Sequence, residues 1–106
     1  MKKNTKPSDN IIKKVKLPYK DEQFAVVIEM SGGSRLKAMC ADGNTRMVRI
    51  GGKFKRRMWV RVNDLILIKP WSVQSDTKAD FAHRYLPTER KWIINRNIIP
   101  EELNIW

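Results

Sequence analysis

Hydrophobic and polar residues alternate along three stretches in the first half of the chain, and this period of two predicts strands. The stretches cover residues 23–30, 35–40 and 45–50. In each stretch one set of apolar residues shares a face, and in the second and third we expect that face to point inward. The three sets are Phe24, Val26, Ile28 and Met30; Leu36, Ala38 and Cys40; and Val48 and Ile50.

Two polar segments separate these stretches and have the composition of tight turns. Residues 31–34 read Ser-Gly-Gly-Ser, and glycines of this kind supply the positive φ that a hairpin turn requires. Asp42 and Gly43 mark a second turn. The first half of the chain is therefore predicted to form a three-stranded meander.

Two more strands are predicted in the second half of the chain. Residues 59–69 are expected to form one long strand with a bulge or bend at Asn63 and Asp64, and its part from 65 to 68 is apolar on both faces. Residues 79–85 alternate again and give the fifth strand. Five short strands without long crossover helices favour a closed barrel, which leaves no free sheet edge. The predicted fold class is mainly β, a five-stranded OB-fold barrel.

Prolines delimit a short C-terminal helix. Pro87 suits a first helical position and Pro100 a stop, so we expect a helix from residue 87 to about 97. Residues 92–94 also have strand propensity, which is the competing interpretation. The side chains expected to face the barrel are those of Trp92, Ile93 and Ile99.

The first 16 residues are rich in Lys and Asn and contain too few apolar side chains to offset the entropy of ordering. We expect a disordered basic tail, either a solubilising segment or an arm that folds onto nucleic acid. The predicted organisation is a flexible N-terminal tail over 1–20, a barrel over 21–86 and a helical extension over 87–106. Near the C-terminus, Leu103, Ile105 and Trp106 either pack onto the domain or face a partner.

Positive charge is concentrated in two parts of the 106-residue chain, whose formal net charge is +11. Residues 1–20 hold seven Lys and one Asp, and residues 31–61 hold nine Lys or Arg and one Asp. Residues 21–30 are net acidic, and residues 62–106 hold six residues of each sign. A basic surface confined to the tail and the middle of the domain indicates a polyanionic partner.

The segment from Gly51 to Val60 combines four cations with two aromatic residues. In an extended chain, alternate residues would separate into a cationic face around an indole and a mostly apolar face. Cations with an exposed ring suit single-stranded or loop RNA, because cations neutralise phosphates and rings stack on bases. The alternative is that the Trp packs in the core or barrel rim and that the cations lie on a solvated loop. The first face consists of Lys55, Arg57, Trp59 and Arg61, and the second of Arg56, Met58, Val60 and Val62.

The residues that enzymes and metalloproteins need are sparse. One Cys and one His allow neither an internal disulfide nor a Cys/His metal cluster, and His83 has no Ser or Cys partner nearby in sequence. Gly51, Gly52 and Lys53 lack the spacing and the Ser or Thr of a P-loop. We therefore expect a non-enzymatic protein without catalytic residues, cofactor or metal. With no apolar run of membrane-spanning length and no signal peptide, a cytoplasmic location is expected.

Several stretches in order and at matching spacing resemble translation initiation factor 1A of archaea and eukaryotes. The resemblance covers roughly residues 21–103. Its stretches are Phe24–Val27, Leu36–Gly43, Thr45–Met47, Gly52–Val60, Asp64–Leu67 and Lys78–Phe81.

The resemblance implies an OB-fold of the S1 type, shared with bacterial initiation factor 1, that binds ribosomal RNA in the A site of the small subunit, over the decoding centre. There it would act as a monomer, stabilise initiator tRNA and mRNA binding, and block premature entry to the A site. The basic tail would be the arm that reaches toward the P site. By resemblance, the RNA-binding positions would be Arg35, Arg46, Lys55, Arg56, Arg57 and Trp59, with Lys53 nearby.

The C-terminal part departs from the family pattern. Eukaryotic members have a long acidic tail that engages initiation factor 5B, whereas this chain has only Glu101 and Glu102 there and resembles the archaeal form. The apolar residues 103–106 are a candidate for a weaker contact with this or other initiation factors. The helix start, Leu86-Pro87-Thr88, also differs from the polar cap that the family more often has. Alternative interpretations are a general single-stranded RNA-binding protein of the cold-shock type, a permanent ribosomal protein and an RNA-processing enzyme.

Overall fold

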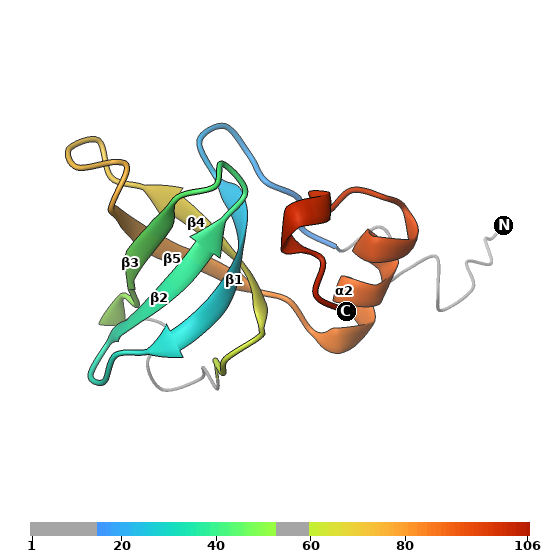
Figure 1. Ribbon diagram of the computed structural model, residues 1–106, viewed down its shortest axis with the longest axis horizontal. Coiled ribbons are helices and arrows are strands. Elements are labelled where there is room, and N and C mark those ends of the chain that lie inside the picture. Colours follow the sequence, from blue (N-terminus) through green and yellow to red (C-terminus); the bar gives the residue numbers. More distant parts are fainter. Residues whose placement is uncertain (1–14, 53–59) are drawn as a thin grey trace, which may run out of the picture.

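A computed structural model describes residues 15–52 and 60–106. It contains a closed barrel of five strands, as the sequence pattern predicts, and the structure places them in the order β1-β2-β3-β5-β4 (Figure 1). Strands β3 and β5 pair in parallel, and the other neighbours pair antiparallel. The elements are β1 Gln23–Met30, β2 Arg35–Cys40, β3 Thr45–Arg49, β4 Leu65–Pro70, β5 Lys78–Arg84, α2 Pro87–Asn95 and the 3₁₀-helix η2 Glu101–Leu103.

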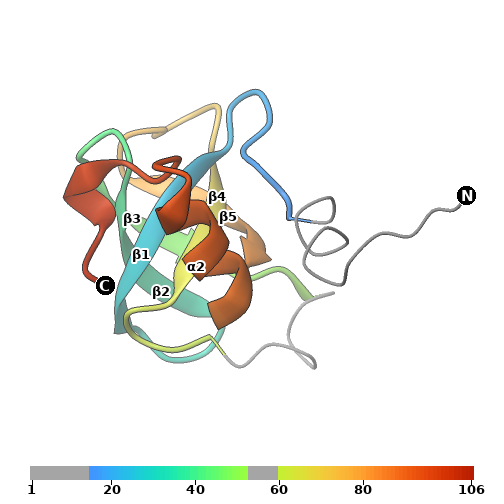
Figure 2. The same ribbon diagram turned by 90° about the vertical axis from the view of Figure 1, so that its right-hand side faces the viewer.

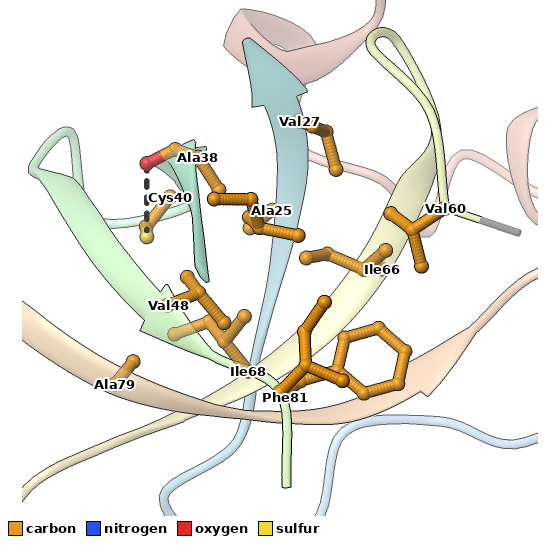
Figure 3. Close-up of a cluster of buried hydrophobic side chains, with 12 residues drawn as sticks. Ala25, Val27, Ala38, Cys40, Val48, Val60, Ile66, Ile68, Ala79 and Phe81 are labelled. Carbon is orange, nitrogen blue, oxygen red and sulfur yellow. Dashed lines mark hydrogen bonds between the residues drawn. The ribbon is translucent and has the colours of Figure 1, made fainter. Parts of the chain in front are cut away.

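The barrel interior is filled by alternate residues of all five strands (Figure 3). The inward positions predicted for residues 35–40 and 45–50 are confirmed. All five side chains are buried: Leu36, Ala38, Cys40, Val48 and Ile50. Cys40 behaves as a small core residue whose Sγ lies 3.7 Å from the Ala38 carbonyl oxygen. The interior residues are Ala25, Val27, Leu36, Ala38, Cys40, Val48, Ile50, Val60, Ile66, Ile68, Ala79 and Phe81.

A second apolar cluster lies outside the barrel, between β1, β4 and the C-terminal helix (Figure 2). It explains why residues 65–68 are apolar on both faces: Ile66 and Ile68 face the barrel interior, and Leu65 and Leu67 face this seam. All four are at most 1% exposed. The expectation that the helix packs on the barrel is confirmed by Ile93. The seam residues are Phe24, Val26, Leu65, Leu67, Tyr85, Ile93, Ile99 and Leu103, with Trp92 packed against them.

The apolar face predicted for the first strand extends over only half of it. Phe24 and Val26 are buried in the seam, but Ile28 is 43% and Met30 is 42% exposed. The register with β2 shifts between Val27 and Glu29, and this irregularity separates the two halves of β1. The barrel interior instead receives Ala25 and Val27 from this strand.

The prediction of one long strand over 59–69 was wrong for the described part of its first half. Strand β4 begins only at Leu65, and residues 62–63 form a turn in which Asn63 has φ of 76°. The Asp64 carboxylate accepts a hydrogen bond from the Arg61 backbone N–H at 2.9 Å, which stabilises this turn. As a result Val60 is buried, whereas Val62, expected on the same apolar face, is 48% exposed.

The C-terminal helix begins at the predicted proline and ends at Asn95, two residues earlier than expected. Its N-terminus has no polar side chain at the cap position, but the Leu86 backbone N–H donates to Glu89 Oε1 at 2.7 Å. The chain leaves the helix through Asn97, which has φ of 56°. Across the residues described, no helix is long and apolar enough to cross a membrane. The predicted N-terminal tail, apart from residues 15–20, lies outside the described residues.

Candidate nucleic-acid interface

Three segments meet at one end of the barrel: the β1–β2 turn, the end of β3 with Ile50, and the turn after residue 60 (Figure 1). The β1–β2 turn is closed by a hydrogen bond from the Ser31 N–H to the Arg35 carbonyl, and Ser34 accepts one from the Ile50 N–H at 2.7 Å. The turn after residue 60 joins β1 through the Asn63 N–H and the Val27 carbonyl, also at 2.7 Å. Gly32 and Gly33 both have positive φ, as the sequence predicts for this turn.

Two of the predicted RNA-binding cations lie in these segments. Arg35 and Arg61 are exposed, and neither side chain forms an ion pair within the described part of the chain. In the sheet Arg35 lies opposite Arg49. Next to Arg35 along β2, Lys37 contacts Glu29 at 3.6 Å, but both side chains are about half exposed and are accessible to solvent. This end of the barrel therefore carries unneutralised positive charge.

The position of Arg61 is set by Asp64, which lies immediately before β4. Besides accepting from the Arg61 N–H, the Asp64 carboxylate forms an ion pair with the Arg84 guanidinium at 3.1 Å. Both partners are partly buried, so this pair ties the turn after residue 60 to β5. The main chain that bears Arg61 is thus held against the barrel, while its side chain faces solvent.

Arg46 differs from the expectation of an RNA-facing cation, because its residue exposure is only 2%. Its two terminal nitrogens donate to the two oxygens of Asp42 at 2.9 and 2.7 Å. Its Nε donates to the Ser75 carbonyl oxygen at 2.5 Å. The guanidinium therefore links the β2–β3 turn to the β4–β5 loop, and because its side chain is only 3% exposed it does not face a phosphate in this arrangement.

The carboxylate of Asp42 is adapted to this partner. Hydrogen bonding to Arg46 holds the pKa of Asp42 well below its usual range, with smaller contributions from the Asn44 backbone N–H and the Gln23 amide. Asp42 therefore stays charged at neutral and mildly acidic pH, where the buried Arg46 is charged as well. Sequence periodicity did not reveal this pair, although the separation of four residues across the turn at Gly43 is compatible with it.

The remaining predicted RNA-binding residues belong to the segment between β3 and β4. That segment leaves the barrel at Gly52 and returns at Val60, at the same end as the Arg35 turn. Whether it runs extended, with an indole between cations, stays a prediction. The residues that lie outside the described part are Lys53, Lys55, Arg56, Arg57 and Trp59.

A second cationic and aromatic group, which sequence reasoning missed, lies on the outer surface of β3 and β5. The Trp71 indole N–H donates to Asp80 Oδ1 at 3.0 Å, and Arg49 Nε lies 3.3 Å from the same oxygen. The Arg49 guanidinium lies 5.4 Å from the centre of the Trp71 ring. The signal in the sequence was a Trp next to Lys69-Pro70 at the predicted strand end, but only the parallel pairing of β3 with β5 brings Arg49 to it.

His83 is half-buried beside the seam. Its ring packs edge-to-face against the Tyr85 ring, with the two ring centres 4.7 Å apart. Its Nε2 has no hydrogen-bond partner within the described residues. Burial lowers the pKa of His83 from its ordinary value, because the charged form is poorly solvated there. Nearby Glu89 opposes this shift, and Lys16 reinforces it.

The shifted pKa of His83 predicts a pH dependence of stability. The unfolded chain takes up a proton at about pH 6.5, whereas the folded chain does so only at lower pH. The free energy of unfolding should therefore fall as the pH is lowered through about 6.5, because protons bind preferentially to the unfolded state. Urea denaturation between about pH 5 and 8 tests this, since the chain has one His. The variant His83→Leu should lose the dependence in this window; a dependence of unchanged size would assign it to other groups.

The closed five-stranded barrel, with a cationic surface at one end and a C-terminal helix on its side, places the chain among OB-fold proteins. The family model described as Translation initiation factor 1A / IF-1 matches residues 12–105, and the chain belongs to this family.

Similar proteins support this assignment along most of their length. Translation initiation factor 1A of Thermoplasma acidophilum is 41% identical over 101 residues, which span 93% of this chain and 84% of that protein. The protein of the same name from Pyrococcus abyssi is 38% identical, with 95% and 89% of the two chains covered. That of Methanothermobacter thermautotrophicus is 44% identical, with 77% and 83% covered.

Proposed function

We propose that this protein binds the A site of the small ribosomal subunit, over the decoding centre, and promotes initiator tRNA and mRNA binding during assembly of the initiation complex. Membership of the translation initiation factor 1A family over residues 12–105 is the observation that carries this proposal. The proposed ligand is ribosomal RNA. The protein acts by binding and positioning, without a reaction of its own.

The charge of the barrel end supports an RNA ligand. Arg35 and Arg61 are exposed there and have no ion pair among the described residues. A phosphate that binds them therefore displaces water and counterions and breaks no ion pair of these two side chains within the described residues. Together with the cations between Lys53 and Arg57, they form the proposed contact surface. Arg46 is assigned a different role: its bonds to Asp42 and Ser75 fix the two loops beside this surface.

The first test is binding of the fluorescently labelled protein to purified small subunits, with an excess of unstructured RNA as competitor and over a salt series. The proposal expects saturation at one protein per subunit, persistence against competitor and reversal by salt. With about six to eight phosphates neutralised, the slope of log K against log salt should be about −4 to −7. Competition by free RNA mole for mole would favour a general RNA-binding protein of the cold-shock type instead.

Charge reversals at the barrel end should weaken this binding without unfolding the protein. Arg35→Glu and Arg61→Glu should each lower the affinity about tenfold at moderate salt and reduce the salt slope by about one. Their melting temperatures should stay close to that of the unsubstituted protein, because both side chains are exposed and unpaired within the described residues. The matched control is Lys91→Glu at an exposed position of α2, which packs on the outside of β1 and β4 (Figure 1).

The double reversal of Arg56 and Arg57 to Glu tests the segment that sequence alone assigns to RNA. A folded double variant with unchanged affinity for the subunit would remove that segment from the interface. Equal loss in the Lys91→Glu control and in the barrel-end variants would show that only net charge matters. Either result would leave the family assignment intact and require a different contact surface.

A further inference from the structure

A hollow lies on the outer surface of the barrel, where β4 ends and the β4–β5 loop passes beside β3 and β5. Its lining combines an aromatic ring with cationic and apolar side chains. Val73, one of the lining residues, is 71% exposed, which is high for an apolar side chain. The lining residues are Arg49, Lys69, Pro70, Trp71, Ser72, Val73 and Asp80.

The indole of Trp71 is held in a fixed orientation. Its N–H donates to Asp80 Oδ1 at 3.0 Å, and the Arg49 guanidinium lies 5.4 Å from the ring centre. Arg49 and Trp71 both contact Oδ1 of Asp80. The other carboxylate oxygen, Oδ2, makes no hydrogen bond within the described residues. Because Arg49 lies over one face of this ring, a flat ligand would meet the other face, and the ring is already ordered by the hydrogen bond at its edge.

The cations of the hollow are able to reach a ligand. The Arg49 side chain is 61% exposed and meets Asp80 through Nε, so its terminal amino groups remain open to solvent. Lys69 is exposed and forms no ion pair among the residues described. Arg49 lies opposite Arg35 in the sheet, so one cation of the hollow is a neighbour of the basic end of the barrel.

We propose that this hollow binds one unpaired RNA nucleotide, with its base against Trp71 and Val73 and its phosphate beside Arg49 and Lys69. This inference rests on the proposed function, because it adds a nucleotide site to the RNA-binding surface described above. The ring and the exposed apolar side chain suit the flat base of a nucleotide, and the exposed cations suit its anionic backbone. The free Asp80 oxygen favours a base that carries an amino group, since a carboxylate accepts such a donor.

Two substitutions at the same position separate stacking from internal hydrogen bonding. Trp71→Phe and Trp71→Leu both remove the N–H that Asp80 accepts, but only Phe keeps an aromatic face. We expect Trp71→Phe to bind small subunits within about threefold of the unsubstituted protein and Trp71→Leu to bind about tenfold or more weakly. Equal affinities of the two variants would overturn the inference. Thermal melting of both variants shows whether lost binding reflects unfolding.

Val73→Asp provides a test that removes no internal contact of the indole. A carboxylate at this exposed position should repel the phosphate and weaken subunit binding about tenfold, with an unchanged melting temperature. The control with the same charge change is Ile105→Asp, at a 54% exposed position beside α2. If the unsubstituted protein binds subunits and Val73→Asp binds equally well, the nucleotide site is wrong and the proposed function stands. If the unsubstituted protein does not bind subunits, the proposed function fails and the site fails with it.

Discussion

Replacing Asp42 with alanine is expected to lower the free energy of unfolding by about 3 kcal/mol. The reason lies in Arg46, whose side chain is only 3% exposed and donates to both Asp42 oxygens. Without Asp42 the guanidinium would remain in a water-poor site with the Ser75 carbonyl as its remaining partner. Urea denaturation near neutral pH measures the loss, and an unchanged m value would show that it is a loss of stability.

Three further variants separate the charge from the turn that Asp42 also stabilises. Asp42→Asn keeps an oxygen that can accept from the Asn44 N–H but loses the charge, so it should still be clearly destabilised. The double variant Asp42→Ala with Arg46→Met should be more stable than Asp42→Ala alone, because it leaves no unpaired guanidinium. Glu29→Ala removes the exposed pair with Lys37 and should cost at most about 0.5 kcal/mol. Equal losses for Asp42→Ala and Glu29→Ala would contradict the role given to Arg46.

Replacing Leu67 with alanine is expected to lower the free energy of unfolding by about 3 kcal/mol, because Leu67 is fully buried in the seam. Ile66→Ala should cost a similar amount, but it removes packing from the barrel interior. Ile66 and Leu67 are adjacent in β4 but belong to different clusters. The two variants therefore test whether the barrel interior and the seam stabilise different parts of the protein. Denaturation with urea gives the total loss in each variant.

Hydrogen exchange of the α2 backbone amides distinguishes the two variants. Leu67→Ala should reduce the protection of α2 more than Ile66→Ala does, because α2 packs on the seam through Ile93. Equal loss of protection in both variants would show that barrel and helix unfold as one unit. In that case the division into two clusters would describe packing but not stability.

The order of strands and turns was predictable because it depends on local pattern. Alternation in 35–40 assigned Leu36 and Ala38 to the interior correctly, and the positive φ of Gly32 and Gly33 follows from their lack of a side chain. The helix start at Pro87 was equally local. Each of these features depends on residues within a few positions of one another.

The errors in the fold came from long-range pairing. Ile28 and Met30 continue the alternation of β1, but Ile28 lies at the register shift and Met30 beyond it, where the barrel and helix no longer cover them. Likewise, the apolar character of Val60 and Val62 suggested a strand, but the bonds of Asp64 to Arg61 and Arg84 favour a turn before β4. A residue pattern cannot show which partner strand or side chain will compete for these groups.

The candidate site was predictable in kind but only partly in membership. The sequence by itself determined a small basic β-barrel, its turns and the excess of cations over 31–61, because composition and period are local properties. Only the tertiary structure decided that Arg46 is enclosed by Asp42 and Ser75, whereas Arg49, Trp71 and Asp80 form an open group. The physical reason is that the free energy of a charge depends on its solvation and its partners. Barrel closure brings those partners from positions up to 31 residues away, as for Arg49 and Asp80 across the parallel pair of β3 and β5.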